Sequence, residues 1–390
     1  MKGSFALFLT VILILTLFSA CTPRVHPGVD SSGLEPFVIG GIGPLTEDSS
    51  ERGLSVKNGA QLAIDEINAT GGVNGFRLVL NFQDSKATPE TAITVYEKLK
   101  ANDMNVLLGG VLSEETAALS RVSAVDGFLT ITPTAGAKEA LGSDGNAFRV
   151  CSDNTRSGIA AANFLADKKL ATDAAVVYSE SFFDGEEIYR AFFTTCTSRG
   201  IRTTPKLFPI QGKASDPNNL KLFLKEIKER SFDAIYLVLS PEDTELFLKN
   251  FTREEELVFF CTPPKDNPLY EGLLQVTAFC SEEENILAKN FIETYEQTFQ
   301  TKPDSYAADA YDAVYAIAEA IKRAGITPSN VEESETNQKL IEAMKKIEVH
   351  GVTGTMSWTT DGETTRPATI RIFQKGTFVP FIPDETGENP

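Results

Sequence analysis

Apolar and polar positions divide the chain into short apolar runs and longer segments with helical periodicity. Residues 37–42 and 76–82 are apolar runs of a length typical of buried strands. Between them, over residues 53–68, apolar side chains recur three or four positions apart, at Val56, Ala60, Ala63, Ile64 and Ile67. This spacing predicts a helix with one buried face, which ends at Gly71-Gly72 because glycine accepts the left-handed conformation. The segment is therefore a strand–helix–strand unit.

The same unit repeats in two series along the chain. The first series continues with predicted helices at 88–101 and 114–125 and strands at 106–110 and 128–132. After Cys151 the alternation restarts, with helices expected at 158–167, 185–199 and 219–230 and strands at 174–178, 206–210 and 234–239. Two such series predict an α/β fold of two doubly wound lobes, each with a parallel sheet.

The remaining third of the chain changes in character. Residues 285–325 are rich in helical pattern, and a final helix is expected at 335–346. Residues 355–381 are strand-like, with Asp361-Gly362 and Lys375-Gly376 as turns.

The N-terminus has the proportions of a secretory signal. Lys2 precedes an apolar run at residues 5–18, which is too short and too abruptly ended for a permanent membrane span. Ser19, Ala20 and Cys21 follow, and residues 17–21 resemble the lipobox of bacterial lipoproteins, in which the cysteine is acylated. We therefore expect a signal peptide at 1–20, a lipid on Cys21 and a flexible tether at 21–36. The alternative is ordinary signal cleavage beside a chance cysteine.

The length of the chain indicates its number of lobes, and its charge excludes some classes of binding partner. The chain has 390 residues, and what remains beyond the signal is too long for one ordinary core and suits two lobes. The formal net charge is −18, with no basic cluster, so nucleic acid and anionic lipid headgroups are not expected as partners. We expect a monomer.

The remaining cysteines, Cys151, Cys196, Cys261 and Cys280, predict no metal site. None has CxxC spacing, and the chain contains two histidines, His26 and His350. Cys261 and Cys280 could form a disulfide in an oxidising envelope or remain buried free thiols, and the sequence leaves both open.

Candidate binding groups follow three strands of the first series. Ligands of open parallel sheets bind beyond the carboxyl ends of the strands, where loops lead into helices. Three junctions of this kind stand out: residues 43–46, with Thr46 at their end; Ser113; and residues 132–136. Hydroxyls and free N–H groups there suit a carboxylate. Ser113 could instead be the N-cap of the following helix.

Several runs resemble the type 1 periplasmic binding proteins of the branched-chain amino acid group, the substrate-binding components of ABC importers. The most specific is NGAQLAIDEIN at 58–68 followed by GGVNG at 71–75. The others follow in order: Gly109-Gly110 with Ser113, residues 131–133, Phe148-Arg149, Asp153, Gly158, YAADAYDAV at 306–314 and GVTG at 351–354. The likeness covers the chain from Phe37 onward.

The resemblance implies two lobes that close on a small ligand about three hinge crossings. The first lobe would hold residues 37–150 and 281–354, and the second 151–280 and 355–390. Ser113, Thr134 and the backbone of Val111, Leu112 and Ser113 would hold the ligand carboxylate. Phe183 would cover the ligand from the second lobe, with core packing as the alternative role.

Some positions depart from the family pattern. Gly136 stands where relatives have a ligand-binding threonine, and Glu114 and Glu115 stand where they have serine or threonine. Carboxylates there complement the helix dipole but repel a nearby ligand carboxylate. The tyrosine and acidic residue that bind the ligand ammonium in relatives have no counterpart in residues 237–241 or 262–265.

The expected function is a solute-binding lipoprotein that delivers a small ligand, an amino acid or related carboxylate, to an ABC permease. The alternative is an envelope scaffold, sensor or regulator of a membrane protein that keeps the fold. No Ser–His or Cys–His pair can be drawn, so neither an enzyme nor a cofactor is expected.

Overall fold

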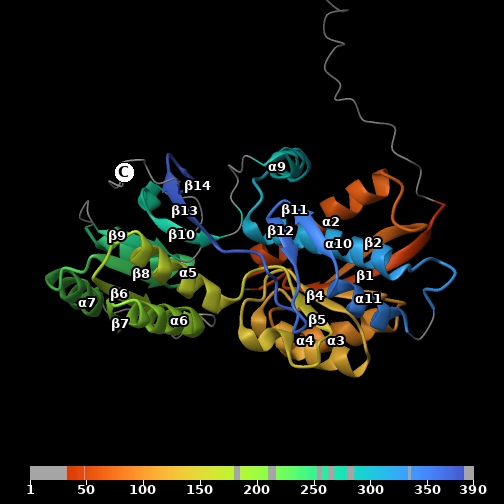
Figure 1. Ribbon diagram of the computed structural model, residues 1–390, viewed down its shortest axis with the longest axis horizontal. Coiled ribbons are helices and arrows are strands. Elements are labelled where there is room, and N and C mark those ends of the chain that lie inside the picture. The colour runs from red at the N-terminus through yellow and green to blue at the C-terminus, as the bar shows by residue number, and fades with distance from the viewer. Residues whose placement is uncertain are drawn as a thin grey trace, which may run out of the picture.

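The structure, a computed structural model, describes residues 33–47, 49–179, 185–209, 217–252, 257–261, 268–277, 279, 285–332 and 335–381. These residues form two lobes side by side, each built on a sheet with helices on both faces (Figure 1). The two-lobed α/β fold predicted from the alternating pattern is confirmed.

The first sheet is parallel throughout, with strand order β2-β1-β3-β4-β5. Its strands are β1 (Glu35–Gly43), β2 (Phe76–Asp84), β3 (Val106–Gly109), β4 (Thr130–Thr132) and β5 (Ala147–Arg149). The order reverses direction at β1, so the loops after β1 and β3 diverge and leave a crevice between them. Glu35 and Pro36 belong to β1 and not to the predicted tether.

Helices cover both faces of the first sheet. On one face, β1 packs in a common core with α2 (Ser50–Ala69), α9 (Ile286–Phe299), α10 (Ser305–Ala324) and α11 (Thr336–Met344). On the other face, Ile42 packs with α3 (Pro89–Lys100) and α4 (Ser113–Val125). The helix expected at 53–68 starts at Ser50, one turn earlier. In it Gly59 allows α10 to approach, because a β-carbon there would lie 2.0 Å from the Ala307 carbonyl oxygen.

The second sheet has the order β14-β13-β10-β9-β8-β6-β7. Five strands are parallel: β6 (Asp173–Tyr178), β7 (Arg202–Leu207), β8 (Ala234–Val238), β9 (Val258–Cys261) and β10 (Leu274–Thr277). At one edge, β13 (Thr369–Gln374) and β14 (Thr377–Pro380) run antiparallel. The predicted turn at Lys375-Gly376 joins them, with φ angles of 53° and 90°.

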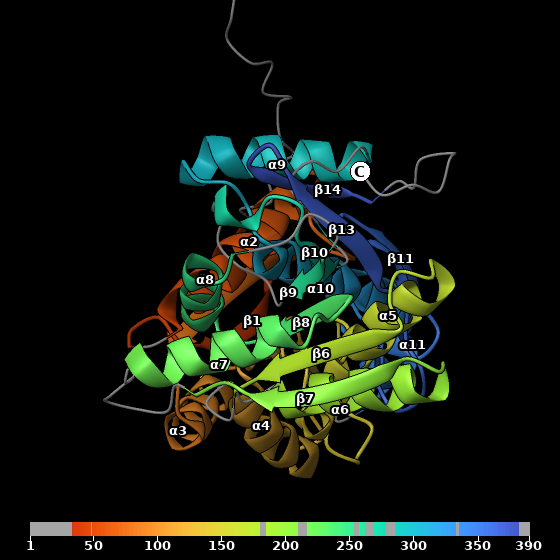
Figure 2. The same ribbon diagram turned by 90° about the vertical axis from the view of Figure 1, so that its left-hand side faces the viewer.

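This sheet is also covered on both faces, as the view from the side of the second lobe shows (Figure 2). One core joins it to α5 (Asn154–Asp167) and α6 (Gly185–Ser198). The other joins it to α7 (Pro217–Glu229) and α8 (Pro241–Asn250). The sequence pattern did not predict α8, β9 or β10, and it placed β7 four residues too late.

Three chain segments cross between the lobes. They join β5 to α5, β10 to α9, and the hairpin of β11 (Glu348–Gly351) and β12 (Gly354–Ser357) to β13. Met356 and Trp358 are buried in the core of the first lobe. The third crossing therefore lies later than Gly354, where the first lobe was expected to end; the other lobe boundaries stay a prediction.

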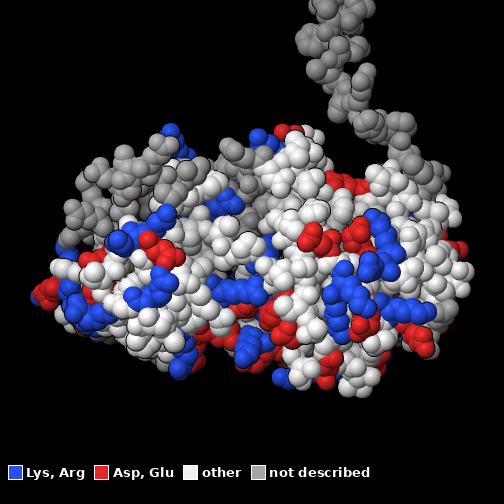
Figure 3. Space-filling view, in the orientation of Figure 1, with Lys and Arg blue, Asp and Glu red and all other residues white. Residues whose placement is uncertain are grey.

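The surface carries acidic and basic side chains interspersed over both lobes on the face in Figure 3. Within the described ranges, no helix combines the length and the apolar character needed to cross a bilayer. The predicted signal run, Cys21 and most of the tether lie outside the described residues.

Candidate functional site

A cavity of about 150 Å³ lies between the two lobes. First-lobe residues that line it include Arg52 and Tyr306, at the N-terminal ends of α2 and α10. Second-lobe residues include Ile188 of α6 and Tyr236 of β8. Since both lobes supply its walls, opening the hinge would expose any ligand held there.

Two of the residues predicted to bind the ligand, Thr134 and Gly136, line this cavity. The Thr134 hydroxyl donates to the Val111 carbonyl oxygen at 2.7 Å, so the loop after β4 is fastened to the loop after β3. A β-carbon on Gly136 would lie 2.2 Å from Oδ1 of Asn154, which also lines the cavity. The Asn154 side chain thus occupies the space beside Gly136, which explains why a larger residue is absent there.

Ser113 is the first residue of α4, and the N-cap is Leu112, so the N-cap alternative for Ser113 is wrong. Its Oγ accepts a hydrogen bond from the Ala137 backbone N–H at 3.2 Å. Ser113, Val111 and Leu112 are not among the cavity-lining residues described. Val111 and Ser113 instead support the loop that carries Thr134 and Gly136, and Leu112 packs against the core of the first lobe.

Glu115, one of the two acidic residues at the start of α4, does not face the cavity. Ser85 donates to its Oε1 at 2.6 Å, and its own Oε2 accepts from the Leu112 N–H at 3.5 Å. Burial raises the pKa of Glu115, and these hydrogen bonds oppose that effect. Glu114 is exposed. Neither residue lines the cavity, so the expected repulsion of a ligand carboxylate does not arise there.

Thr46, in the loop after β1, is engaged with β2 rather than with the cavity. Its hydroxyl donates to Asp84 Oδ2 at 2.6 Å, and the Leu45 N–H donates to Asp84 Oδ1 at 2.8 Å. Burial raises the pKa of Asp84, but the hydrogen bonds outweigh it and hold the pKa below its usual value. Thr46 therefore connects the loop after β1 to the end of β2 at the carboxyl edge of the sheet.

Phe183 and residues 262–265 lie outside the described residues. Cys151, Cys196 and Cys261 are free thiols, and Cys280 lies outside the described part. Burial raises the pKa of Cys261 to about 12, so it stays a neutral thiol. Among the described residues no group of three His, Cys, Asp or Glu side chains could hold a metal ion.

The charged lining residues Arg52, Asp309 and Arg366 were not predicted. Arg366 Nη1 and Asp309 Oδ1 form an ion pair at 2.9 Å, with side chains 3% and 10% exposed. The guanidinium carbon of Arg52 lies 4.7 Å from the centre of the Tyr306 ring. Asp309 lies within the motif at 306–314, but no local pattern indicates its partner, which lies 57 positions away.

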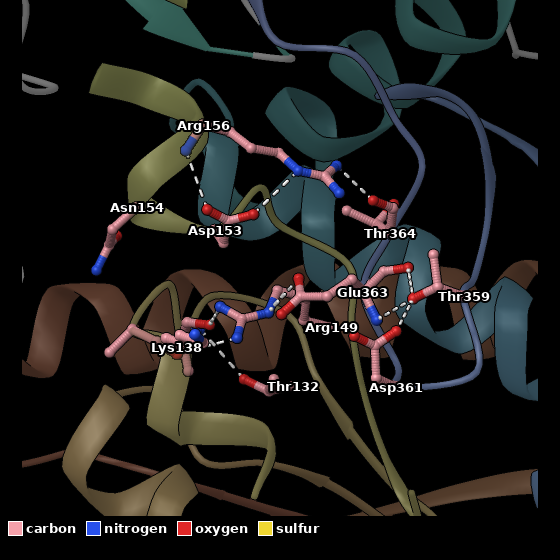
Figure 4. A network of polar contacts seen from close by, with 12 residues as sticks. Thr132, Lys138, Arg149, Asp153, Asn154, Arg156, Thr359, Asp361, Glu363 and Thr364 are labelled. Atoms are coloured by element: carbon pink, nitrogen blue, oxygen red, sulfur yellow. Dashed lines mark hydrogen bonds and ion pairs between the residues drawn. The ribbon is translucent and has the colours of Figure 1, made fainter. Parts of the chain in front are cut away.

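A polar network at the hinge supports the cavity wall (Figure 4). Arg149, at the end of β5, is fully buried, and its two terminal nitrogens donate to the carbonyl oxygens of Ala135 and Ala137, both at 2.9 Å. Its Nε lies 3.0 Å from Glu363 in the third crossing segment. Burial raises the pKa of Glu363, although the Arg149 charge opposes this. The loop of Thr134 and Gly136 is thereby fixed to the hinge.

A second contact joins the lobes directly. Glu187, in the first turn of α6, accepts hydrogen bonds from the Lys138 backbone N–H at 3.2 Å and from Asn154 Nδ2 at 3.1 Å. Lys138 begins the short helix η1 (Lys138–Leu141) of the first lobe, which packs on α4. One carboxylate thus bridges the lobes next to the cavity.

Comparison with known proteins adds the family context. The family model described as periplasmic binding protein matches residues 36–377. A Leu/Ile/Val-binding protein homologue of Brucella melitensis is 23% identical over 91% of this chain and 95% of its own length. A Leu/Ile/Val-binding protein of Rhizobium johnstonii is 31% identical, over half the length of each chain.

Solved structures share the fold. A substrate-binding protein of an ABC transporter from Desulfitobacterium hafniense, in complex with Leu, has a TM-score of 0.75 at 20% identity, covering 89% of this chain and all of the other. A solute-binding protein of an ABC transporter from R. palustris, in complex with benzoate, has a TM-score of 0.74 at 17% identity, covering 88% and 95%.

Proposed function

Because this chain belongs to the periplasmic binding protein family, we propose that it captures a small carboxylate between its lobes and delivers it to an ABC importer. The observation that carries the proposal is the cavity between the lobes, whose walls come from both. A ligand enclosed there is shielded from water, which strengthens each of its polar contacts and favours the closed form. Closure also changes the surface offered to a permease.

The class of ligand follows from the relatives and the cavity together. One structural neighbour holds leucine and another benzoate, and both molecules carry a carboxylate. In this chain the cavity presents hydroxyl groups and the Arg52 guanidinium, which are hydrogen-bond donors suited to a carboxylate. The family context supports transport over an envelope scaffold or regulator.

Within this proposal the predicted site residues take two roles. Thr134 and Gly136 face the ligand, and Val111 and Ser113 hold the loop that carries them. Leu112 is the N-cap of α4, and Thr46 fastens the loop after β1 to Asp84. For Phe183 we keep the role expected from the sequence, which is to cover the ligand from the second lobe. The family consists of solute-binding proteins, so we propose capture without catalysis; turnover of a bound compound would contradict this.

The experiment is release and rebinding of the ligand. Protein purified without refolding is denatured, and the released small molecules are identified by mass spectrometry. The identified compound, added at a hundredfold excess over its dissociation constant, should stabilise the native protein by about 2.7 kcal/mol. Absence of any released compound, together with no shift in melting point across a broad panel of solutes, would contradict the proposal.

We further propose that the protein works outside the cytoplasm, anchored by a lipid on Cys21, which would keep it near its permease. Cys21→Ser should move the protein from the membrane fraction to the soluble extracytoplasmic fraction, measured by fractionation and by loss of the mass of the acyl chains. Cys151→Ser, which changes a cysteine in the hinge region, should leave both unchanged. Retention in the membrane fraction of Cys21→Ser protein from which residues 1–20 have been cleaved would exclude the lipid as the anchor.

A further inference from the structure

The charges around the cavity do not balance. Among the described residues that line it, three are charged at neutral pH: Arg52, Asp309 and Arg366. Asp309 and Arg366 neutralise each other in their ion pair, which is almost entirely shielded from solvent. A buried pair of this kind is costly to break, because each partner would be left as an isolated charge. Arg52 therefore remains as the charged lining residue without an ion-pair partner among the described residues.

The position of Arg52 is not explained by the stability of its helix. It lies in the first turn of α2, where the helix dipole is unfavourable to a cation. Its described contact is the face of Tyr306, and within the described part of the chain it forms no ion pair. Asp304 lies near enough to feel the charge of Arg52 but forms no ion pair with it; the Asp304 oxygens accept from Ser55 Oγ at 2.8 Å and from the Ala307 N–H at 2.9 Å, so the Arg52 guanidinium keeps its hydrogen-bond donors for a ligand.

The cavity also limits the size of the ligand. A volume of about 150 Å³ equals that of an engineered cavity in another protein that binds benzene. The rest of the lining combines hydroxyl groups, such as those of Ser152 and Ser157, with apolar groups from Ile188, Val276 and Phe279. A compact molecule with one polar end and one apolar end fits these walls.

From these observations we infer that the ligand is a small monocarboxylate without an ammonium group, whose carboxylate is bound by Arg52. This inference rests on the function proposed above and narrows it. The planar guanidinium can donate two parallel hydrogen bonds to a carboxylate, and it is oriented by its contact with Tyr306.

An amino acid fits the described charges less well. Its ammonium group would need a carboxylate, and Asp309, the acidic side chain among the described lining residues, already binds Arg366. A zwitterion would therefore bury an unpaired ammonium or compete with an existing ion pair. A monoanion neutralises Arg52 and requires neither.

The experiment compares acids that differ in the amino group alone. Binding of 4-methylpentanoate and of L-leucine, which share one carbon skeleton, is measured by isothermal titration calorimetry on the full-length mature protein. 3-Phenylpropanoate and L-phenylalanine form a second pair, and benzoate is a fifth probe. We expect at least one of the three simple acids to bind, and its amino acid partner to bind at least about a hundredfold more weakly.

The role of Arg52 is tested with Arg52→Met, which keeps an unbranched stem over Tyr306 and removes the charge. It should weaken the acid by about 10- to 100-fold, the loss expected for a hydrogen bond to a charged group. Arg121→Met, on the exposed side of α4, is the matched control and should leave affinity unchanged. The melting point of each ligand-free variant verifies that the protein is folded.

Three outcomes would overturn the inference. If L-leucine or L-phenylalanine binds as tightly as its deaminated partner, the charge argument is wrong while the proposed capture of a carboxylate stands. If an acid binds equally well to Arg52→Met, the carboxylate is held elsewhere. If no probe binds, the compound released on denaturation decides: an ammonium group on it overturns the inference, and absence of any compound overturns the proposed function as well.

Discussion

Arg149 is buried behind the loop that carries Thr134 and Gly136 and holds it by two hydrogen bonds. It connects the loop after β4 and its own strand to the third crossing, which is distant from both in sequence. Its backbone oxygen also accepts from the indole N–H of Trp358 at 2.7 Å. Carbonyl oxygens that accept from a buried guanidinium are held more firmly than carbonyls that face water. The conformation of residues 134–137 is therefore held in part by a residue that does not line the cavity.

Arg149→Met tests this role. The change leaves Glu363 without its cation and the Ala135 and Ala137 carbonyls without their donor, so we expect the free energy of unfolding to fall by about 3–5 kcal/mol. Urea denaturation followed by circular dichroism measures the fall. Arg121→Met, on the exposed side of α4, should change stability by less than about 0.5 kcal/mol. A loss below about 1 kcal/mol in Arg149→Met would show that the loop holds its shape without this residue.

The sequence predicted cavity residues in a loop that follows a strand, but it did not predict cavity residues that are brought together by long-range contacts. Thr134 and Gly136 follow a strand and precede a helical segment, a local pattern that is visible in one dimension, and they line the cavity. Arg52, Asp309 and Arg366 line it too, but no local pattern marks Arg52 or Arg366, and the motif that contains Asp309 does not indicate its partner. Arg366 reaches Asp309 because the third crossing passes over α10, and such a long-range contact leaves no periodic signal in the chain.

Among the elements, α10 links the cavity to the hinge hairpin. Asp312, on this helix, is fully buried and accepts from the backbone N–H groups of Val352 and Thr353, each at 2.9 Å. A β-carbon on Gly351 would lie 2.3 Å from the same carboxylate, so the hairpin can approach only with glycine there. Two of the motifs that suggested the family, at 306–314 and 351–354, are therefore one structural contact.

The contact predicts a pH dependence of stability. Burial raises the pKa of Asp312 from its ordinary value of 3.8 to about 6, despite the hydrogen bonds from Thr353 and Val352 that oppose the change. Since the folded pKa is above the unfolded pKa, this group contributes stability below pH 4, and that contribution is lost as the pH rises through 6. At about 1.4 kcal/mol for each pH unit between the two values, the loss is about 3 kcal/mol.

Asp312→Asn isolates this effect because asparagine does not titrate. Between pH 4 and pH 7 the free energy of unfolding of the wild type should fall by about 3 kcal/mol relative to Asp312→Asn, measured by urea denaturation at each pH. Asp309 and Glu363, whose pKa values burial also raises, titrate in both proteins and cancel in the difference. Asp65→Asn, on the exposed side of α2, should follow the wild-type profile. Parallel profiles for Asp312→Asn and the wild type would rule out the titration of Asp312 as the cause.

Elements were predictable where the pattern is long and regular. The helices α2 and α3 have an apolar face repeated over three or more turns, and each was found near its expected bounds. The stretch 285–325, expected to be rich in helix, divides into α9 and α10. The strands β9 and β10 have four residues each, and β10 mixes Gln275 and Thr277 with its apolar residues. Such short strands are set by pairing with their neighbours in the sheet, which the local sequence does not specify.

Over the whole molecule, two lobes joined by three crossings allow a hinge motion, and contacts between the lobes set its equilibrium. The lobes were predictable because each series of strands and helices closes on its own sheet. The bridge between them was not, since Glu187 is one of two acidic residues in the first turn of α6, and nothing in the sequence distinguishes it from Glu186. In the structure Glu187 reaches the first lobe, whereas Glu186 pairs with Arg190 on the surface.

This difference between neighbours provides the test of the closed form. Glu187→Gln retains one acceptor oxygen for the two donors Lys138 N–H and Asn154 Nδ2. We therefore expect the closed form to be destabilised by about 1 kcal/mol relative to the open form. This lowers the ratio of closed to open molecules by a factor of about five. Glu186→Gln removes the same charge from the same helix end without touching the first lobe. Small-angle X-ray scattering of the ligand-free proteins should therefore give a larger radius of gyration for Glu187→Gln and the wild-type value for Glu186→Gln.

A bound ligand should restore the compact form of Glu187→Gln. Its affinity should be about fivefold weaker than for the wild type, because part of the binding free energy is then used to close the lobes. Equal radii and equal affinities for the two variants would show that the lobes close without this bridge.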